Sequence, residues 1–399
     1  MTPMNSDWMI ALGLLSATGG WGPYELSPTP PAAFDAPPVE QWTVPLPGPQ
    51  LSSATHTELG EPVIHGEEIF IGSAAADALL VLDRRDGRLL RQMPAAGPVQ
   101  SSPIVAGERV YFSDSSGTTW CYPLDGDVPF WSHYSGAPIL SSPTVTADRV
   151  YLANVDNLVY ALQREDGELA WRYAHRTDPT RTAELELYGA PSPVLSGDEI
   201  LAGFSDGALI SLSADSGDPL WSRRVGEGAY PDLIAAALIH GDEIIVSGYS
   251  EPLLAMDRQT QSVRWRLDAG GPQAAVVADE QLIHGGGDGV LRALDGRTGD
   301  LLWEWDSDTG AALTRPVPTE AGLLIGASAG SVYLISSGGE LLWSYDPGFF
   351  LAGVTATPAV DGRQALVVTN AGNLISFVVP NAGPGKKPAP PERPPRGPR

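Results

Sequence analysis

Cysteine is almost absent from this 399-residue chain, which contains Cys121 alone. A single thiol can form neither an intramolecular disulfide nor a cysteine-based zinc cluster. Basic residues are also scarce, because 24 lysines and arginines stand against 48 acidic residues, for a formal net charge of −24. A surface this negative repels phosphate backbones, so nucleic acid is not expected as a partner.

Long apolar runs are missing as well. Near the N-terminus the run Trp8–Leu15 is far shorter than the roughly 20 residues that span a bilayer, so no transmembrane span is expected. The run is typical of a secretory signal, except that Asp7 and no basic residue precedes it. Leu15-Ser16-Ala17-Thr18 has the form of a lipoprotein cleavage box with threonine at the place of the lipidated cysteine. Residues 1–20 are a candidate signal-like segment, and we expect a periplasmic or cell-envelope protein, with the cytoplasm as the alternative.

Proline is concentrated in two segments that lack an apolar period. Residues 21–38 are interpreted as a proline-rich linker. Residues 381–399 contain seven prolines and five basic residues, which predicts a disordered tail of polyproline type. Both lysines of the chain, Lys386 and Lys387, lie in this tail.

Residues 39–380 repeat one pattern. In its most complete copy, residues 273–305, four short apolar runs are separated by Asp/Gly-type turns, which predicts a four-stranded antiparallel meander. In the third turn Asp295 can bond the backbone two residues on, and Gly299 can adopt the positive φ that closes a hairpin. Related turns occupy the same position in other copies: Asp83…Gly87, Gln163…Gly167, Ala214…Gly217, and Asp257…Gln261 without the glycine.

A tryptophan follows this turn in most copies. The series is Trp131, Trp171, Trp221, Trp265, Trp303 and Trp343, at spacings of 40, 50, 44, 38 and 40 residues. Arg91 takes the position in the first copy, and Trp42 is a further member, so seven of the eleven tryptophans share one position. We interpret them as structural docking residues that bury the contact between neighbouring repeats. Each buries about 150–250 Å², and truncation to alanine is expected to cost about 3–5 kcal/mol.

The first strands mark eight repeats. They start at Pro62-Val63, Pro103-Ile104, Pro143-Thr144, Pro193-Val194, Ile234-Ala235, Ala275-Val276, Pro316-Val317 and Pro358-Ala359. The eighth repeat has three strands and no tryptophan, and residues 40–44 around Trp42 supply the missing strand. The sequence therefore predicts an all-β chain, an eight-bladed β-propeller of four-stranded antiparallel blades, with the last blade closed by an N-terminal strand.

The string Ala293-Leu294-Asp295-Gly296-Arg297-Thr298-Gly299-Asp300-Leu301-Leu302-Trp303 resembles the tryptophan-docking repeat of propellers of the pyrroloquinoline-quinone (PQQ) type. Within that superfamily the chain is most similar to the BamB family, the lipoprotein component of the outer-membrane β-barrel assembly machinery. This resemblance implies eight blades, no cofactor and no catalysis, and a role in outer-membrane protein assembly. It also implies a partner-binding loop before the fourth blade, with a Leu-x-Leu-Arg-Gly pattern.

The 50-residue spacing marks an insertion at that place, Arg176 to Gly189. By the resemblance, Leu185, Leu187 and Tyr188 would contact the membrane-embedded barrel subunit, with Tyr188 at the place of the family's arginine. Exposed leucines beside a tyrosine on an inserted loop are also a candidate interaction patch in their own right. The alternative is a loop that folds over the end of the ring and buries its own leucines.

The motifs that suggest chemistry all have a structural explanation. Gly203-Phe204-Ser205-Asp206-Gly207 matches a nucleophile elbow, but it falls at a hairpin turn of the repeat with no helix after it. The six histidines show no metal-ligand spacing and are expected at the surface or in turns. No catalytic, cofactor-binding or metal-binding residue is assigned.

We therefore expect a binding scaffold, monomeric and not an enzyme, that binds a protein partner. Two alternatives stay open. One is a PQQ- and calcium-dependent dehydrogenase, although the adjacent Cys-Cys disulfide against which many such enzymes stack the quinone cannot form with Cys121 alone. The other is a ligand- or polysaccharide-sensing propeller that uses the loop residues Tyr188, Tyr230 and Phe349-Phe350.

Overall fold

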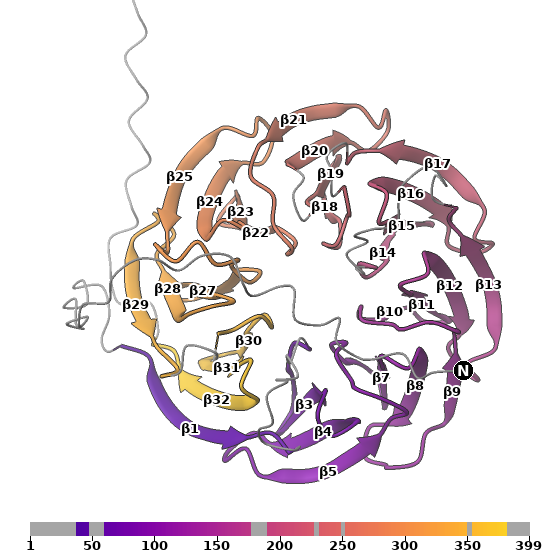
Figure 1. Cartoon of the computed structure of the whole chain (residues 1–399), viewed down its shortest axis with the longest axis horizontal. Coiled ribbons are helices and arrows are strands. Elements are labelled where there is room, and N and C mark those ends of the chain that lie inside the picture. Colours follow the sequence, from indigo (N-terminus) through magenta and orange to yellow (C-terminus); the bar gives the residue numbers. More distant parts are fainter. Residues whose placement is uncertain are drawn as a thin grey trace, which may run out of the picture.

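The computed structural model describes residues 37–47, 60–176, 190–226, 231–248, 252–348 and 353–380. In these ranges the chain forms eight four-stranded antiparallel sheets, arranged as the blades of a ring (Figure 1). The expected eight-bladed β-propeller is confirmed. None of the described residues forms a helix that could cross a membrane.

Each blade runs from an inner strand to an outer strand (Figure 1). The first four blades are built from the following strands: blade 1 from β2 (Val63–His65), β3 (Glu68–Ser73), β4 (Ala78–Asp83) and β5 (Leu89–Pro94); blade 2 from β6 (Ile104–Ala106), β7 (Arg109–Ser113), β8 (Thr118–Pro123) and β9 (Trp131–Tyr134); blade 3 from β10 (Thr144–Val145), β11 (Arg149–Ala153), β12 (Leu158–Gln163) and β13 (Leu169–Ala174); blade 4 from β14 (Val194–Ser196), β15 (Glu199–Gly203), β16 (Ala208–Ser213) and β17 (Pro219–Arg224).

The remaining blades complete the ring: blade 5 from β18 (Leu238–His240), β19 (Glu243–Val246), β20 (Leu253–Asp257) and β21 (Val263–Leu267); blade 6 from β22 (Val276–Ala278), β23 (Gln281–Gly285), β24 (Val290–Asp295) and β25 (Leu301–Asp306); blade 7 from β26 (Val317–Thr319), β27 (Gly322–Gly326), β28 (Val332–Ile335) and β29 (Leu341–Tyr345); blade 8 from β30 (Ala359–Asp361), β31 (Gln364–Val368), β32 (Asn373–Val378) and β1 (Val39–Pro45). The expected start of the fifth repeat at Ile234-Ala235 is wrong. Its first strand begins at Leu238.

The N-terminal strand closes the ring. β1 pairs antiparallel with β32, from Val39 opposite Val378 to Pro45 opposite Asn373. On its outer side the Tyr345 hydroxyl of blade 7 donates to Glu40 Oε2 at 2.9 Å. The pairing removes the open edge that β32 would otherwise present to solvent.

The core lies between neighbouring blades, where the second and third strands are almost wholly buried. One cluster, for example, joins Phe70 and Val81 of blade 1 to Val110 and Phe112 of blade 2. Each blade therefore buries its two faces against its two neighbours, as expected for a fold whose repeats contact only adjacent repeats.

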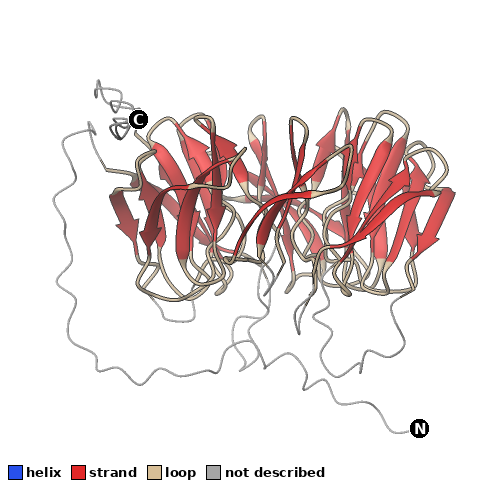
Figure 2. Ribbon diagram, turned by 90° about the horizontal axis from the view of Figure 1, so that it is seen from above, coloured by secondary structure: helices blue, strands red, loops and turns tan. Residues whose placement is uncertain are grey.

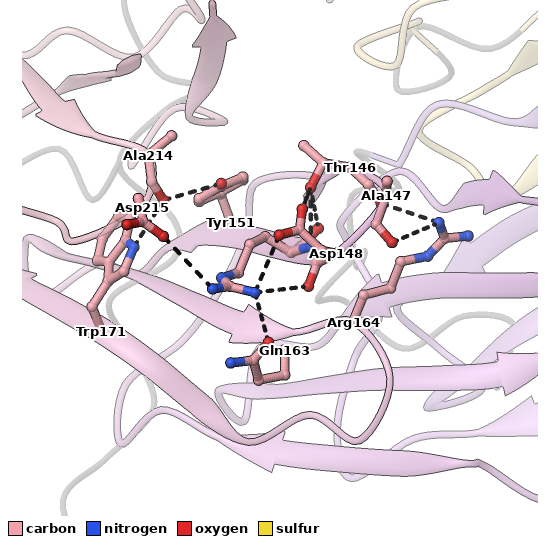
Figure 3. A network of polar contacts seen from close by, with 10 residues as sticks. Thr146, Ala147, Asp148, Tyr151, Gln163, Arg164, Trp171, Ala214 and Asp215 are labelled. Atoms are coloured by element: carbon pink, nitrogen blue, oxygen red, sulfur yellow. Dashed lines mark hydrogen bonds and ion pairs between the residues drawn. The ribbon is translucent and has the colours of Figure 1, made fainter. Parts of the chain in front are cut away.

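The recurrent tryptophans share one register. Trp131, Trp171 and Trp265 lie on the outer strands opposite Cys121, Ala161 and Ala255 of the third strands. Their indole N–H groups donate to a turn of the following blade: Trp131 to the Arg164 carbonyl (3.1 Å), Trp171 to that of Ala214 (3.0 Å) and Trp265 to that of Gly296 (2.9 Å). In Figure 3 Trp171 and Tyr151 both reach the Ala214 carbonyl.

Glycine is required where these indoles meet the next turn. Gly217 has a φ of +75°, and a Cβ atom placed on it would lie 2.5 Å from Trp171 Cε3. Gly167 shows the same geometry against Trp131. In blade 1, where Arg91 replaces the tryptophan, the guanidinium donates to the equivalent carbonyl, that of Leu124.

The ring has two faces (Figure 2). Because strands alternate in direction, the turns between first and second strands and between third and fourth strands lie on one face, which we call the turn face. The turns between second and third strands, and the connections between blades, lie on the opposite face, which we call the loop face.

Candidate partner-binding face

The inserted segment before blade 4 belongs to the loop face, because it connects β13 to β14. The three candidate contact residues, Leu185, Leu187 and Tyr188, lie outside the described residues. The same holds for Tyr230 and for Phe349-Phe350. The structure describes the residues that flank the insertion, up to Arg176 and from Ala190 onward.

His175 fixes the chain where it enters the insertion. Its backbone N–H donates to the Asn157 carbonyl at 3.0 Å, and its Nε2 lies 2.9 Å from Asp206 Oδ2. The imidazole packs against the buried ring of Phe204, with ring centroids 4.4 Å apart. These contacts join the outer strand of blade 3 to the hairpin between β15 and β16 of blade 4.

Ser192 fixes the chain where it leaves the insertion. Its hydroxyl accepts a hydrogen bond from the backbone N–H of Ser142 at 3.0 Å. The Pro193 carbonyl accepts one from the Thr144 hydroxyl of blade 3. Both ends of the inserted segment are therefore held by two blades at once.

Ser192 is also one of a set of polar residues that precede the first strands of the blades. The residue before the proline of the first strand is polar in six blades, and these residues are Glu61, Ser102, Ser142, Ser192, Arg315 and Thr357. In the first three blades the backbone N–H of this residue donates to the hydroxyl of its counterpart in the next blade: Glu61 to Ser102 (2.9 Å), Ser102 to Ser142 (3.1 Å) and Ser142 to Ser192 (3.0 Å).

Arg315 of blade 7 adds an ion pair to Glu61 of blade 1, at 2.6 Å between Nη2 and Oε2. This ion pair joins two blades that blade 8 separates. The hydrogen bond from Ser142 to Ser192 joins blade 3 to blade 4 beside the residues that flank the insertion.

The chemical motifs of the sequence lie in ordinary structural positions. Ser205 sits in the turn between β15 and β16, where its hydroxyl is 3.4 Å from Asn157 Oδ1. Within the described ranges, no three His, Cys, Asp or Glu side chains are grouped closely enough to hold a metal ion.

The expectation that the histidines lie at the surface or in turns is wrong for His284. This side chain is fully buried in β23, because the strand sits between two blades. Desolvation, and then the nearby positive charge of Arg292, lower its pKa to about 4. The imidazole is therefore neutral at physiological pH.

Sequence reasoning missed His175 and Asp206 as the support of the insertion. They are 31 residues apart, and only the hairpin register of blade 4 brings them together. A signal was present, because a histidine directly precedes the insertion and an aspartate occupies the hairpin of the blade that follows it.

Comparison with known proteins gives one consistent result. The family described as "Outer membrane protein assembly factor BamB" matches residues 32–132, 125–287 and 287–382. A curated relative of that description from Legionella pneumophila (strain Paris) is 28% identical over 49% of this chain and 52% of its own length. The chain thus spans about half the length of the curated relatives that it matches first.

Solved structures agree on the fold. The crystal structure of BamB from Moraxella catarrhalis superposes with a TM-score of 0.69 at 18% identity, covering 82% of this chain and 99% of that one. A shorter likeness, 26% identity over 38% of this chain and 28% of the relative, joins it to the "Putative dehydrogenase XoxF" of Paracoccus denitrificans.

Proposed function

Since this chain belongs to the family of the outer membrane protein assembly factor BamB, we propose that it is a non-catalytic scaffold of the cell envelope that binds a protein partner in outer-membrane protein assembly. The loop face is the binding face, and the inserted segment before blade 4 is its central element. Leu185, Leu187 and Tyr188 provide the apolar contact with the partner, which the resemblance identifies as the barrel subunit of the assembly machinery.

One observation carries this proposal: the insertion is anchored at both ends on a rigid ring. His175, held by Asp206 and Phe204, fixes one end, and Ser192, held by Ser142, fixes the other. Binding residues on loops that a rigid scaffold positions lose less entropy on association than residues on free loops. The two ends also belong to different blades, so the partner contacts a surface that spans a blade boundary.

The experiment is a pull-down with the barrel subunit that compares the native chain with Leu185→Asp/Leu187→Asp. We expect the variant to lose the partner, because two carboxylates would be desolvated in an apolar contact. The matched control is Leu301→Asp/Leu302→Asp, two leucines that are 49% and 48% exposed on the outer strand of blade 6. The control should retain the partner. Both variants should have the same Tm as the native chain.

Retention of the partner by Leu185→Asp/Leu187→Asp would refute the role of the insertion. Loss of the partner in both variants would place the contact elsewhere or indicate a general effect of added negative charge. A third variant, His175→Ala, separates anchoring from contact, because it leaves the leucines in place and removes the support of the entering chain. We expect it to weaken partner binding rather than abolish it.

The likeness to a dehydrogenase supports a second candidate, a quinoprotein that uses PQQ and calcium. The described residues do not fit this role, because they contain no group of carboxylates that could hold a calcium ion. Incubation with PQQ and Ca²⁺ followed by absorbance and alcohol-oxidation measurements tests it directly. We expect neither a bound-quinone spectrum nor turnover, and either signal would favour the dehydrogenase.

A further inference from the structure

A polar pocket of about 390 Å³ opens on the turn face between blades 4 and 5. It is lined by Glu199, Trp221, Asp242, Arg258, Gln259 and Gln261. The pocket lies on the face opposite the inserted segment, so it is separate from the proposed partner-binding face. It also lies at a boundary that lacks the docking hydrogen bond of Trp131, Trp171 and Trp265.

The change starts at Gln261. This residue takes the turn position that glycine holds in the neighbouring blades, with a φ of +54° and the same backbone bond, from its N–H to the Asp257 carbonyl at 2.8 Å. Its side-chain amide donates to the Arg258 carbonyl at 3.1 Å, which is the acceptor that the preceding tryptophan uses at other blade boundaries.

With this carbonyl bonded to Gln261, Trp221 lacks the docking contact that Trp131, Trp171 and Trp265 make. Its indole N–H makes no hydrogen bond to any residue that the structure describes, and the side chain is only half-buried. By contrast Trp131 and Trp171 are 7% and 8% exposed. Among these three tryptophans, Trp221 is therefore the one whose indole has a side open to solvent.

The two carboxylates of the pocket, Glu199 and Asp242, also differ from their counterparts in other blades. Glu199 opens the second strand of its blade, as Glu68 and Glu243 do in theirs. Those two form ion pairs with Arg91 and Arg264, at 2.6 and 2.8 Å. Within the described ranges neither Glu199 nor Asp242 has an ion-pair partner; Glu199 accepts only from the Ser211 hydroxyl at 2.7 Å. Arg258 is occupied in part by the Ser196 carbonyl, at 3.1 Å.

An aromatic ring beside two unpaired carboxylates is suited to a cationic side chain. The indole face attracts a guanidinium through its quadrupole, and the carboxylates accept its hydrogen bonds. Proline-rich segments dock on aromatic side chains in the same way, with their shape already set before binding.

We propose that this pocket binds the chain's own C-terminal segment, through the arginines of Arg393-Pro394-Pro395-Arg396-Gly397-Pro398-Arg399. In polyproline II form, with three residues per turn, Arg393, Arg396 and Arg399 share one face. The segment 381–399 carries five basic residues and one acidic residue, whereas the rest of the chain is strongly acidic. Charge complementarity therefore selects this segment.

The path of the chain agrees with this occupant. The last described residues leave β32 on the turn face, where Val379 exchanges backbone and side-chain hydrogen bonds with Arg363, at 2.7 and 3.1 Å. Blades 4 and 5, whose turns line the pocket, lie across the ring from β32 (Figure 1). At about 3.1 Å per residue, an extended chain from Pro380 reaches about 40 Å at Arg393 and only about 19 Å at Lys386, so the distal arginines have the longer reach across the ring.

Zero-length carbodiimide cross-linking of the full chain tests the contact. The variant Arg396→Lys places an amine in the arginine stripe, and peptide mapping then locates the amide that it forms with a carboxylate. We expect cross-links from position 396 to Glu199 or Asp242, and their loss in Glu199→Gln/Asp242→Asn. The native Lys386 and Lys387 serve as internal controls that are expected not to link to these two residues.

Cross-links spread over acidic turns of other blades, such as Asp148 or Glu165, without an excess at Glu199 and Asp242, would overturn the proposal. Links found only in covalent dimers would overturn the intramolecular arrangement and assign the pocket to a second copy. Because the barrel subunit is absent from this experiment, its outcome does not depend on the proposed partner.

Fluorine NMR of the 5-fluorotryptophan-labelled chain gives a second readout. Trp221→Phe assigns the line of Trp221, and Arg393→Gln/Arg396→Gln/Arg399→Gln should then shift that line while leaving the line of Trp171 in place. Lys386→Gln/Lys387→Gln removes charge from the same segment and should leave both lines unchanged. An unchanged chemical shift of Trp221 in the arginine variant would refute the contact.

Discussion

The tryptophan–glycine contact between blades gives the sharpest test of how the ring is held together. Trp171 is 8% exposed, its indole N–H donates to Ala214, and Gly217 packs against its six-membered ring. Truncation of a buried tryptophan to alanine costs about 3–5 kcal/mol. With an unfolding entropy of about 2.1 cal/mol/K per residue, or about 0.7 kcal/mol/K for the ring, this corresponds to a fall in Tm of about 4–7 °C.

Trp221→Ala is the matched comparison, because the residue occupies the same position one blade later. It is half-buried and its indole N–H has no acceptor among the described residues. Less apolar area and no hydrogen bond are lost, so we expect about half the decrease in Tm. Thermal unfolding followed by far-UV circular dichroism measures both, and equal decreases would refute the argument that Gln261 undocks Trp221.

The contribution of Gly217 to the contact is tested by combining its substitution with that of Trp171. Gly217→Ala places a Cβ 2.5 Å from Trp171 Cε3 at a φ of +75°, so the variant has both an overlap and backbone strain of about 1–2 kcal/mol. In a Trp171→Ala background the overlap disappears and the strain alone remains. Gly217→Ala should therefore cost clearly less in that background, and strictly additive losses would show that the two residues do not act as a pair.

Two further predictions concern charged groups. Because burial lowers the pKa of His284 to about 4, against about 6.5 in the unfolded chain, the unfolded state binds the extra proton and stability falls as the pH drops from 6.5 towards 4, by up to about 3 kcal/mol. The decline in Tm over this range should be shallower in His284→Gln, and an unchanged decline would contradict the assignment. Arg91→Trp, which restores the common residue in blade 1, should lower Tm, because Glu68 loses two hydrogen bonds of 2.6 and 2.8 Å. Adding Glu68→Gln to that variant should recover part of the loss, and no recovery would indicate that the ion pair is not what Arg91 contributes.

The ring could be predicted from the sequence because tryptophan fills the docking position and is rare elsewhere in the chain. Trp42 was decisive, since a docking tryptophan before the first complete repeat could belong only to the last blade, and β1 pairs with β32 as expected. Strand starts were read correctly where a proline precedes them. Of the two repeats without this proline, the sixth starts as predicted at Val276, whereas the fifth starts at Leu238 and not at Ile234-Ala235.

The sites were harder to predict from the sequence because they depend on contacts between repeats. The sequence pattern marked Gln261 as a turn without glycine, but its consequence for Trp221 appears only when the acceptor of the amide is known. Likewise, the buried position of His284 follows from the packing of β23 between blades and not from its neighbours in sequence. The candidate contact residues Leu185, Leu187 and Tyr188 stay a prediction.

A repeat ring can carry such departures because each blade packs only on its neighbours. The loss of one glycine at position 261 weakens the boundary between blades 4 and 5, while the boundaries on either side retain the docked indoles of Trp171 and Trp265. Blade 4 therefore borders both unusual features of the ring, the insertion on the loop face and the pocket on the turn face. If the two were coupled, a ligand in the pocket would have to move blade 4 against blade 3. The hydrogen bond from Ser142 to Ser192 and the contact of His175 with Asp206 oppose that motion, so we expect occupancy of the pocket to leave partner binding on the other face unchanged.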